Sequence, residues 1–391
     1  MSNLRRLMFW LTRLWKKNNN KMLRKTLFIC FALIFGSFAL ISSQNNTVKS
    51  QTKNPSPTPT VKKSNTAETL TIAAVGDIMI GSTSINDTFL PPNDGIDMLK
   101  GVTPILSAAD IAFGNLEGPM LEGGKTTKCS PKSTRCFAFR VPTRYGKYLK
   151  DAGFDVLSLA NNHASDFGDF GLESTRKTLD ELGIKHAGSD KFQLASVIVE
   201  SKGKKIAFIG FAHNNIVPNV NDLDFAKTLV EETNKKADIV VVSFHGGSEG
   251  PTAQRVPNKT EVFAGQLRGN LPLFSKTVID AGADLVLGHG PHVLRGMEIY
   301  KDRLVVYSMG NFATYGMFRL ENETALTAIF EIKMALDGKF VSGKIHGGKQ
   351  PGKGGPVLDN SGDATRKLRE LSTADFPTTA PKINDDGTFT K

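Results

Sequence analysis

Residues that can bind a metal ion or move a proton follow several apolar segments of this sequence, each where the segment ends. In one of them an apolar run at Val156–Ala160 predicts a buried strand, and it is followed by Asn161, Asn162, His163 and Asp166. Open α/β sheets bind their ligands at the carboxyl ends of their strands. Taken alone, this stretch is also explained by a polar turn with an Asn or Asp that caps the next helix.

The same arrangement recurs after four further apolar segments, which weakens the turn interpretation. The polar residues that follow those segments are Asp77, then Asn115 and Glu117, then His245, then His289 and His292. Carboxylate, amide and imidazole groups without a thiolate suit divalent ions such as Mn, Fe, Zn or Mg. Sites with two such ions stabilise the attacking and leaving oxygens of phosphoester hydrolysis. We therefore expect these residues to converge on one pocket that binds one or two divalent metal ions.

Strand-like and helix-like segments alternate from Leu70 onward, and these are the elements that must position the polar residues. Helix patterns are found at Arg144–Ala152, Leu172–Leu182, Phe225–Lys236, Leu273–Ala281 and Ala364–Leu371. Turn signals at Lys202-Gly203-Lys204 and Asp337-Gly338 predict two hairpins, so the sheets are not purely parallel. The alternation predicts a layered α/β domain with helices covering mixed sheets.

The positive charge of the chain is concentrated in its first 65 residues. The formal net charge is +11, and residues 1–65 contain 12 Lys and Arg and no acid, which leaves about −1 for the remainder. A folded part with almost no net charge gives no electrostatic argument for binding nucleic acid. We therefore expect no nucleic-acid partner.

The first 66 residues predict a membrane-targeting region. Segment 1–26 is basic, segment 27–43 contains an apolar run at Leu27–Ile41, and segment 44–66 is a polar linker containing proline. The basic flank keeps the N-terminus in the cytoplasm, so residues 67–391 are expected outside the membrane, anchored or secreted after cleavage. Met22 is an alternative start, and residues 1–21 are otherwise a cytoplasmic segment.

Three cysteines are present, and two of them flank a short polar loop. Cys129 and Cys136 enclose this loop, and Cys30 lies in the apolar run. Because an exported chain meets an oxidising compartment, we expect a disulfide between Cys129 and Cys136. Two free thiols are the alternative, and finger spacing for a zinc site is absent.

Six sequence blocks in the same order resemble the CapA family of capsule and poly-γ-glutamate synthesis proteins. They are GDIMIG, GNLEGP, FDVLSLANNHASDFGDFGL, FHGGSE, GHGPHV and YSMGNF, between about Leu70 and Phe376. The resemblance implies a four-layer α-β-β-α sandwich over residues 67–376, like that of calcineurin-type metallophosphoesterases. It also implies a membrane-anchored protein that faces outward. Residues 377–391 are expected to form a polar C-terminal tail.

The resemblance also assigns roles to the polar residues. It implies that His163 assists the leaving group, with Asp166 as its catalytic neighbour. The metal ligands it implies are Asp77, Asn115, Glu117, Asn162, His245, His289 and His292. Two positions depart from the pattern of these phosphoesterases. Met79 replaces the histidine of Asp-x-His. In GHGPHV, Gly290 replaces the first histidine of a His-Pro-His pattern, and His289 stands one position earlier.

These features lead to two hypotheses about function. The first is a metal-dependent hydrolase that acts outside the membrane on a phosphoester or an envelope-polymer linkage. The second is a non-catalytic accessory for synthesis, transport or anchoring of a polyanionic capsule polymer. Expected partners are a cell-envelope or capsule polymer, the membrane through the N-terminal segment, and a polymer synthase complex.

Overall fold

The computed structural model describes residues 68–84, 89–126, 128–129 and 136–391. The basic segment 1–26, the signal segment 27–43 and the linker 44–66 lie outside these residues. Within the described ranges, no helix is both long enough and apolar enough to cross a membrane. The cysteine expectation is confirmed, because Cys129 and Cys136 form a disulfide.

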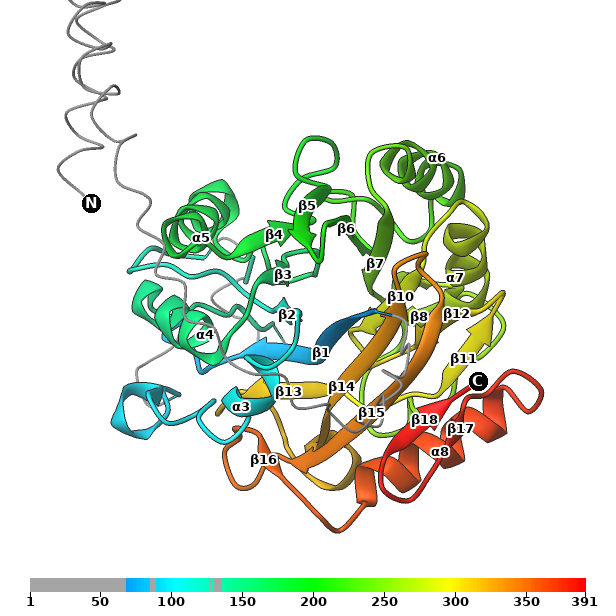
Figure 1. The fold of residues 1–391 in the computed structure, drawn as a ribbon. Coiled ribbons are helices and arrows are strands. Elements are labelled where there is room, and N and C mark those ends of the chain that lie inside the picture. The colour runs from blue at the N-terminus through cyan, green and yellow to red at the C-terminus, as the bar shows by residue number, and fades with distance from the viewer. Residues whose placement is uncertain (1–67, 85–88, 127, 130–135) are drawn as a thin grey trace, which may run out of the picture. The chain divides into compact units, whose positions relative to one another are not determined.

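Two mixed β-sheets form the centre of the described part of the chain (Figure 1). The larger has the order β17-β18-β15-β14-β1-β2-β3-β4, with β13 beside β1 and β16 beside β15. Its strands are β1 (Thr69–Met79), β2 (Ile111–Leu116), β3 (Val156–Ser158), β4 (Lys185–Ala187), β13 (Asn311–Thr314), β14 (Leu326–Ala335), β15 (Phe340–Lys349), β16 (Val357–Leu358), β17 (Lys382–Ile383) and β18 (Thr388–Thr390). The strands that end in candidate ligands, β1, β2 and β3, are parallel neighbours.

The smaller sheet has the order β11-β12-β10-β7-β6-β5. Its strands are β5 (Ser196–Ser201), β6 (Lys204–Ala212), β7 (Ile239–His245), β10 (Leu285–His289), β11 (Met297–Tyr300) and β12 (Arg303–Val306). A separate hairpin consists of β8 (Glu261–Phe263) and β9 (Gln266–Gly269). The hairpins predicted at the two turn signals are confirmed as β5–β6 and β14–β15.

The helices are short and mostly amphipathic. They are α3 (Thr103–Leu106), α4 (Gly146–Ala152), α5 (Gly168–Leu182), α6 (Leu223–Asn234), α7 (Leu271–Asp280) and α8 (Asp363–Asp375), with 3₁₀ turns η1 (Pro92–Gly95), η2 (Thr143–Tyr145) and η3 (Asn322–Ala325). Five of these helices match predicted ones within a few residues. The largest differences are four residues, at the start of α5, which begins at Gly168 rather than Leu172, and at the end of α8, which reaches Asp375 rather than Leu371.

The apolar core consists of three main clusters, because alternate side chains of a strand point to opposite faces of its sheet. In β6, Ile206 and Phe208 pack between the two sheets, whereas Ala207 and Ile209 pack toward α6 and α7. In β1 the alternate residue Val75 packs toward α3, α4 and α5. Two sheets that share one core and are each covered by helices form the α-β-β-α sandwich, so the predicted fold class is confirmed (Figure 1).

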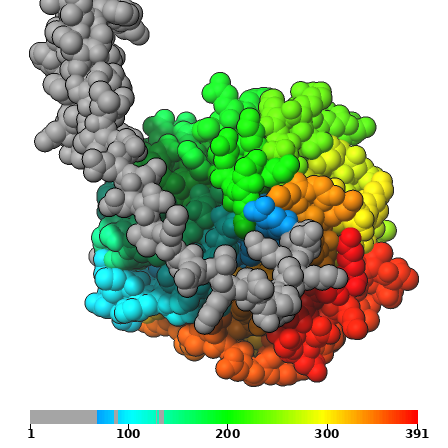
Figure 2. Space-filling view, in the orientation of Figure 1, coloured from blue at the N-terminus to red at the C-terminus, as the bar shows by residue number. Residues whose placement is uncertain are grey.

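The C-terminal segment corrects the expectation of a polar tail at residues 377–391. Strand β18 pairs with β15 and with β17, and thereby extends the larger sheet. Ile383 and Phe389 are buried in the core between the sheets. Figure 2 shows this segment, in red, at the surface beside the orange strands β14 and β15. Strands β17 and β18 were not predicted from the sequence, because residues 377–391 are mostly polar and each strand buries only one apolar side chain.

Strand β1 changes its hydrogen-bonded neighbour immediately before Asp77. It pairs with β14 up to Val75 and with β13 from Asp77 onward. At the change, Gly76 approaches Gly310 so closely that a Cβ on Gly76 would lie 2.0 Å from the Gly310 carbonyl oxygen. Glycine is therefore required there, and this close approach fixes the direction in which Asp77 leaves the sheet.

The C-terminal strand predicts a stability effect that a frayed tail would not give. Phe389 is 0% exposed and stacks on Phe340 with the ring centroids 5.5 Å apart. Replacing it in Phe389→Ala should lower the free energy of unfolding by about 3–5 kcal/mol, because the cavity is internal. Urea denaturation monitored by far-UV circular dichroism measures this, with Thr390→Ala at the exposed neighbouring position as the control. Equal stability of the two variants would contradict the assignment.

Candidate functional site

The two sheets bring the predicted ligands together through their register. Asp77 in β1 lies directly opposite Asn115 in β2, and His245 in β7 lies directly opposite His289 in β10. Each pair belongs to parallel neighbouring strands, whose carboxyl ends meet at one edge of their sheet. The predicted ligands in these pairs therefore come from two strands of the larger sheet and two strands of the smaller sheet.

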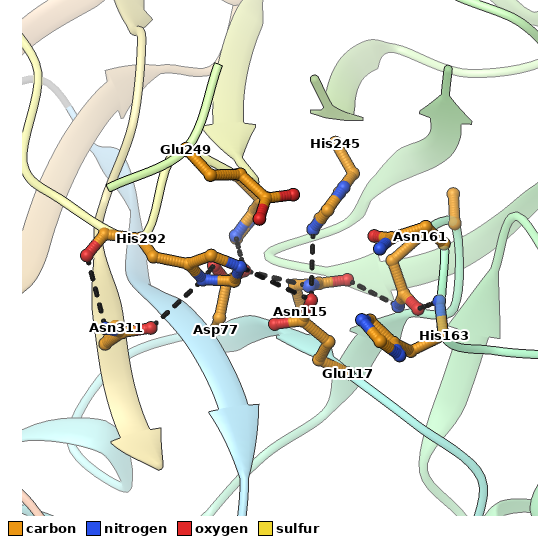
Figure 3. Close-up of polar contacts among 12 residues, drawn as sticks. Asp77, Asn115, Glu117, Asn161, His163, His245, Glu249, His292 and Asn311 are labelled. Atoms are coloured by element: carbon orange, nitrogen blue, oxygen red, sulfur yellow. Dashed lines mark hydrogen bonds and ion pairs between the residues drawn. The ribbon is translucent and has the colours of Figure 1, made fainter. Parts of the chain in front are cut away.

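Asp77, Glu117 and His292 form the centre of the site. Each offers one ligand atom, and these atoms all lie within 4.8 Å of one another. Nδ1 of His292 is 3.1 Å from Oδ2 of Asp77, and Nε2 of His292 is 3.7 Å from Oε1 of Glu117. Figure 3 shows the His292 ring between the two carboxylates. These three residues could hold a metal ion.

Two more histidines complete this centre. Nδ1 of His289 lies 3.3 Å from Oδ1 of Asp77, and Nε2 of His245 lies 3.4 Å from Oε1 of Glu117. Both imidazoles are almost fully buried, at 1% and 0% exposed. Glu117 thus stands between His245 on one side and His292 on the other, an arrangement that suits a carboxylate shared by two cations.

The electrostatics of the pocket favour a positive charge at its centre. Burial raises the pKa of Glu117 to about 7. Burial opposes a charged His292, but Glu117 and Asp77 outweigh it and raise the pKa of His292 to about 10. Burial likewise opposes ionisation of Asp77, but the nearby imidazoles of His289 and His292, at 3.3 and 3.1 Å, hold its pKa well below the ordinary value. For His245, burial dominates and lowers the pKa to about 3.

Buried polar atoms without a hydrogen-bond partner test whether a metal fits. They include one oxygen of Asp77, both carboxylate oxygens of Glu117, the amide oxygen of Asn162, and both ring nitrogens of His245 and His289. An unpaired buried polar group costs about 1–3 kcal/mol. Because all of these are donor atoms for divalent cations, a metal held among them would satisfy several at once. The residues therefore fit a divalent metal.

The two adjacent asparagines of the third strand end have different surroundings. Asn161 donates to Oδ1 of Asn115 at 3.0 Å and to the Leu116 carbonyl at 2.9 Å, and Asn115 donates to Asp77 at 2.9 Å. Both polar atoms of Asn115 are thus used in orienting Asp77, so we treat Asn115 as a support and not as a ligand. The amide oxygen of Asn162 is buried and has no hydrogen-bond partner among the described residues, so it stays a predicted ligand.

His163 and Asp166 form a hydrogen-bonded pair beside the metal ligands. Nδ1 of His163 lies 2.7 Å from Oδ2 of Asp166, and the His163 amide donates to Asn161 at 3.0 Å. A carboxylate on Nδ1 fixes the tautomer and leaves Nε2 to exchange a proton. His163 is 8% exposed, and the Phe139 ring stacks on it at 4.2 Å. This is the geometry of a general acid or base held next to a metal centre.

The sequence did not identify several residues that support the site. Asn311, opposite Asp77 in β13, accepts from Nδ1 of His292 at 3.1 Å and donates to the His292 carbonyl at 3.2 Å. His292 itself has a left-handed backbone, with φ of 58°. A non-glycine residue in this region is strained, which is common at functional sites. Asn311 follows the apolar run Leu304–Tyr307 and belongs to the YSMGNF block, but neither signal assigned it a role.

A second supporting group joins three residues behind His245. The Arg268 guanidinium contacts the Glu249 carboxylate and lies 3.0 Å from the ring nitrogens of His213. Burial, followed by the charge of Arg268, lowers the pKa of His213 to about 3. Burial raises the pKa of Glu249, but the charges of His292 and Arg268 outweigh it and lower the pKa below the usual range. Arg268 comes from the β8–β9 hairpin, which was not predicted from the sequence.

Comparison with known proteins matches this chain to proteins of capsule synthesis. The family model described as bacterial capsule synthesis protein PGA_cap matches residues 71–315. The capsule biosynthesis protein CapA of Bacillus anthracis is 31% identical over 63% of this chain and 60% of its own length. The PGA biosynthesis protein CapA of Bacillus subtilis (strain 168) is 30% identical over 84% of this chain and 82% of its own length.

Among solved structures, the chain is similar to a phosphatase from Mycoplasma pneumoniae. The two share 13% sequence identity over 72% of this chain and 94% of that one, with a TM-score of 0.44.

The geometry predicts that His292 is needed for metal binding. His292→Gln should weaken the binding of Mn²⁺ by about tenfold or more, because even partners of metal ligands change affinity by about 10–100-fold. Titration of Mn²⁺ into the chelator-treated full chain by calorimetry measures this. His346→Gln is the control, since His346 contacts Glu331 at 2.9 Å and lies outside the site. Wild-type affinity in His292→Gln would show that the metal lies elsewhere.

Proposed function

Because the chain belongs to the PGA_cap family of bacterial capsule synthesis proteins, we propose that it is a metal-dependent hydrolase of phosphoester or envelope-polymer linkages. The observation that supports this most is the position of the His163–Asp166 pair beside Asp77, Glu117 and His292. A metal centre alone suits a structural role. A proton-transfer pair next to it suits catalysis.

The ligands would be Asp77, Glu117, Asn162, His245, His289 and His292, all oxygen and nitrogen donors. These favour Mn, Fe, Zn or Mg, in one or two positions around Glu117. When bound, a divalent metal supplies Lewis acidity that polarises a phosphoryl or carbonyl oxygen and activates a water molecule.

The residues of the chain itself then have separate tasks. Asp166 holds Nδ1–H of His163 and so directs Nε2 toward the substrate. From Nε2 the protonated imidazole gives its proton to the leaving oxygen. Asn115 and Asn311 keep Asp77 and His292 in place through the hydrogen bonds described above. The Phe139 ring on His163 and the Phe318 ring, 5.0 Å from His292, shield the site from water.

One departure favours the accessory role as a second candidate. Met79 occupies the place of the histidine in Asp-x-His and is 1% exposed. A thioether is a poor ligand for the hard ions that this site suits, so one nitrogen ligand is lost. In this candidate the metal holds the polyanionic polymer or the fold, and no bond is cleaved.

The His163 side chain provides the test that separates the two candidates. His163→Gln should lower the turnover of bis(p-nitrophenyl) phosphate by about 10²–10⁴-fold, because general acid catalysis contributes that much, and should leave metal content unchanged. Turnover is followed by nitrophenolate absorbance, and metal by mass spectrometry. The control is His186→Gln, since His186 is equally buried, at 8% exposed, and lies away from the site. A metal-loaded wild type that cleaves neither this ester nor an envelope polymer would favour the accessory role.

We place the folded domain outside the membrane, tethered by the N-terminal segment, where it would meet a capsule polymer and a polymer synthase complex. The support is the basic flank before Leu27–Ile41 and the polar linker after it. Protease added to intact spheroplasts should digest residues 67–391, and permeabilised cells serve as the control. Complete protection in intact spheroplasts combined with digestion after permeabilisation would refute this location.

A further inference from the structure

The His163–Asp166 pair is held from outside the catalytic motif by one lysine. The Lys128 ammonium contacts Oδ1 of Asp166, donates to the Asn162 carbonyl at 3.1 Å and lies 3.1 Å from Nδ1 of His163. Asp166 is fully buried at its side chain, whereas the Lys128 side chain is 33% exposed. Lys128 thus brings a positive charge from the surface to a buried carboxylate.

Phe139 holds the same pair from the other side. Its amide donates to Oδ2 of Asp166 at 2.8 Å, and its ring stacks on His163. The two oxygens of Asp166 therefore have different partners. Oδ1 contacts Lys128, and Oδ2 contacts His163 and accepts a hydrogen bond from the Phe139 amide. Among the described residues, the polar contacts of this carboxylate come from His163, Lys128 and the Phe139 amide.

The disulfide joins those two segments. Cys129 follows Lys128 directly, and Cys136 lies three residues before Phe139. We propose that Lys128 is a positioning residue for the His163–Asp166 pair and that the Cys129–Cys136 disulfide holds it there. The expected effect of Lys128 on turnover rests on the proposed hydrolase function, whereas its expected effect on the position of Asp166 does not.

The physical reason is the cost of an unpaired buried charge. Without Lys128, Asp166 would remain buried with no cationic side chain against its Oδ1 oxygen, and such groups are strongly destabilised. The carboxylate would move toward water, and this movement removes the acceptor that orients Nδ1 of His163. The imidazole would then lose the fixed direction that proton transfer requires.

The first test replaces the charge and keeps the length of the side chain. Lys128→Met should lower kcat for bis(p-nitrophenyl) phosphate by about 10–100-fold with little change in KM or metal content, as for other residues that orient a catalytic group. Lys128→Arg should restore most of the loss, because a guanidinium also binds a carboxylate. Lys125→Met, an exposed lysine of the same loop, is the matched control and should behave as wild type.

The second test removes the covalent link. In the full chain, Cys129→Ser with Cys136→Ser should lower kcat in the same direction as Lys128→Met. Both cysteines are changed together so that neither is left to pair with Cys30. Circular dichroism and thermal melting check that the variant is folded. Wild-type kcat in this variant, with the loss present in Lys128→Met, would overturn the role of the disulfide.

A third readout needs no turnover. Hydrogen–deuterium exchange of the Phe139 amide, measured by mass spectrometry of the full chain, reports the bond to Asp166 directly. Exchange should become faster in Lys128→Met and in the double serine variant, and should be unchanged in Lys125→Met. If the wild type cleaves no ester, faster exchange still supports the positioning role while the hydrolase proposal fails. Unchanged exchange and unchanged kcat in Lys128→Met would overturn the inference.

Discussion

The structure of the site depends on two carboxylates that are buried together. Asp77 is 0% exposed and Glu117 is 1% exposed, and both face the same small group of histidines. Buried carboxylates are costly unless cations or hydrogen-bond donors compensate them. Here the compensation comes from imidazoles and one amide, while several donor atoms of the same group have no hydrogen-bond partner in the part of the chain that the structure describes. An arrangement with both a surplus of negative charge and unused nitrogen and oxygen donors is suited to binding a cation.

This requirement explains why both sheets share one core. The strands β1, β2 and β3 supply the carboxylates and amides, while β7 and β10 supply His245 and His289. Neither sheet alone contains the full set of ligands. Apolar side chains between the sheets, such as Phe113 and Phe208 at 5.2 Å, hold the two edges in register. Because interiors are densely packed, a change in this core would move ligands that it does not touch.

The sequence allowed the centre of the site to be predicted, because its residues share one simple rule. Each of them lies at the end of an apolar run of the sequence or within a few residues after it, and an apolar run predicts a buried strand: Asp77, Glu117, His163, His245 and His289. The residues that were missed follow no periodic pattern. Lys128 lies in a loop, and Arg268 lies on a hairpin whose Val262 and Leu267 are 59% and 58% exposed. Loop conformation is fixed by contacts distant in sequence, so these positions became visible only in three dimensions.

The sequence also did not show which asparagines are metal ligands and which only hold a ligand in place through hydrogen bonds. Asn115 and Asn162 both looked like ligands, since an amide after a strand can serve either purpose. The hydrogen bonds separate them: Asn115 is engaged by Asp77 and Asn161, and Asn162 has an unpartnered oxygen. Met79 likewise provides no nitrogen ligand. Glu117 nevertheless lies within 3.4 Å of His245 and 3.7 Å of His292, so it can still be shared between the two sides of the site. Glu117 and its two histidine neighbours therefore stay together in this chain although position 79 carries methionine.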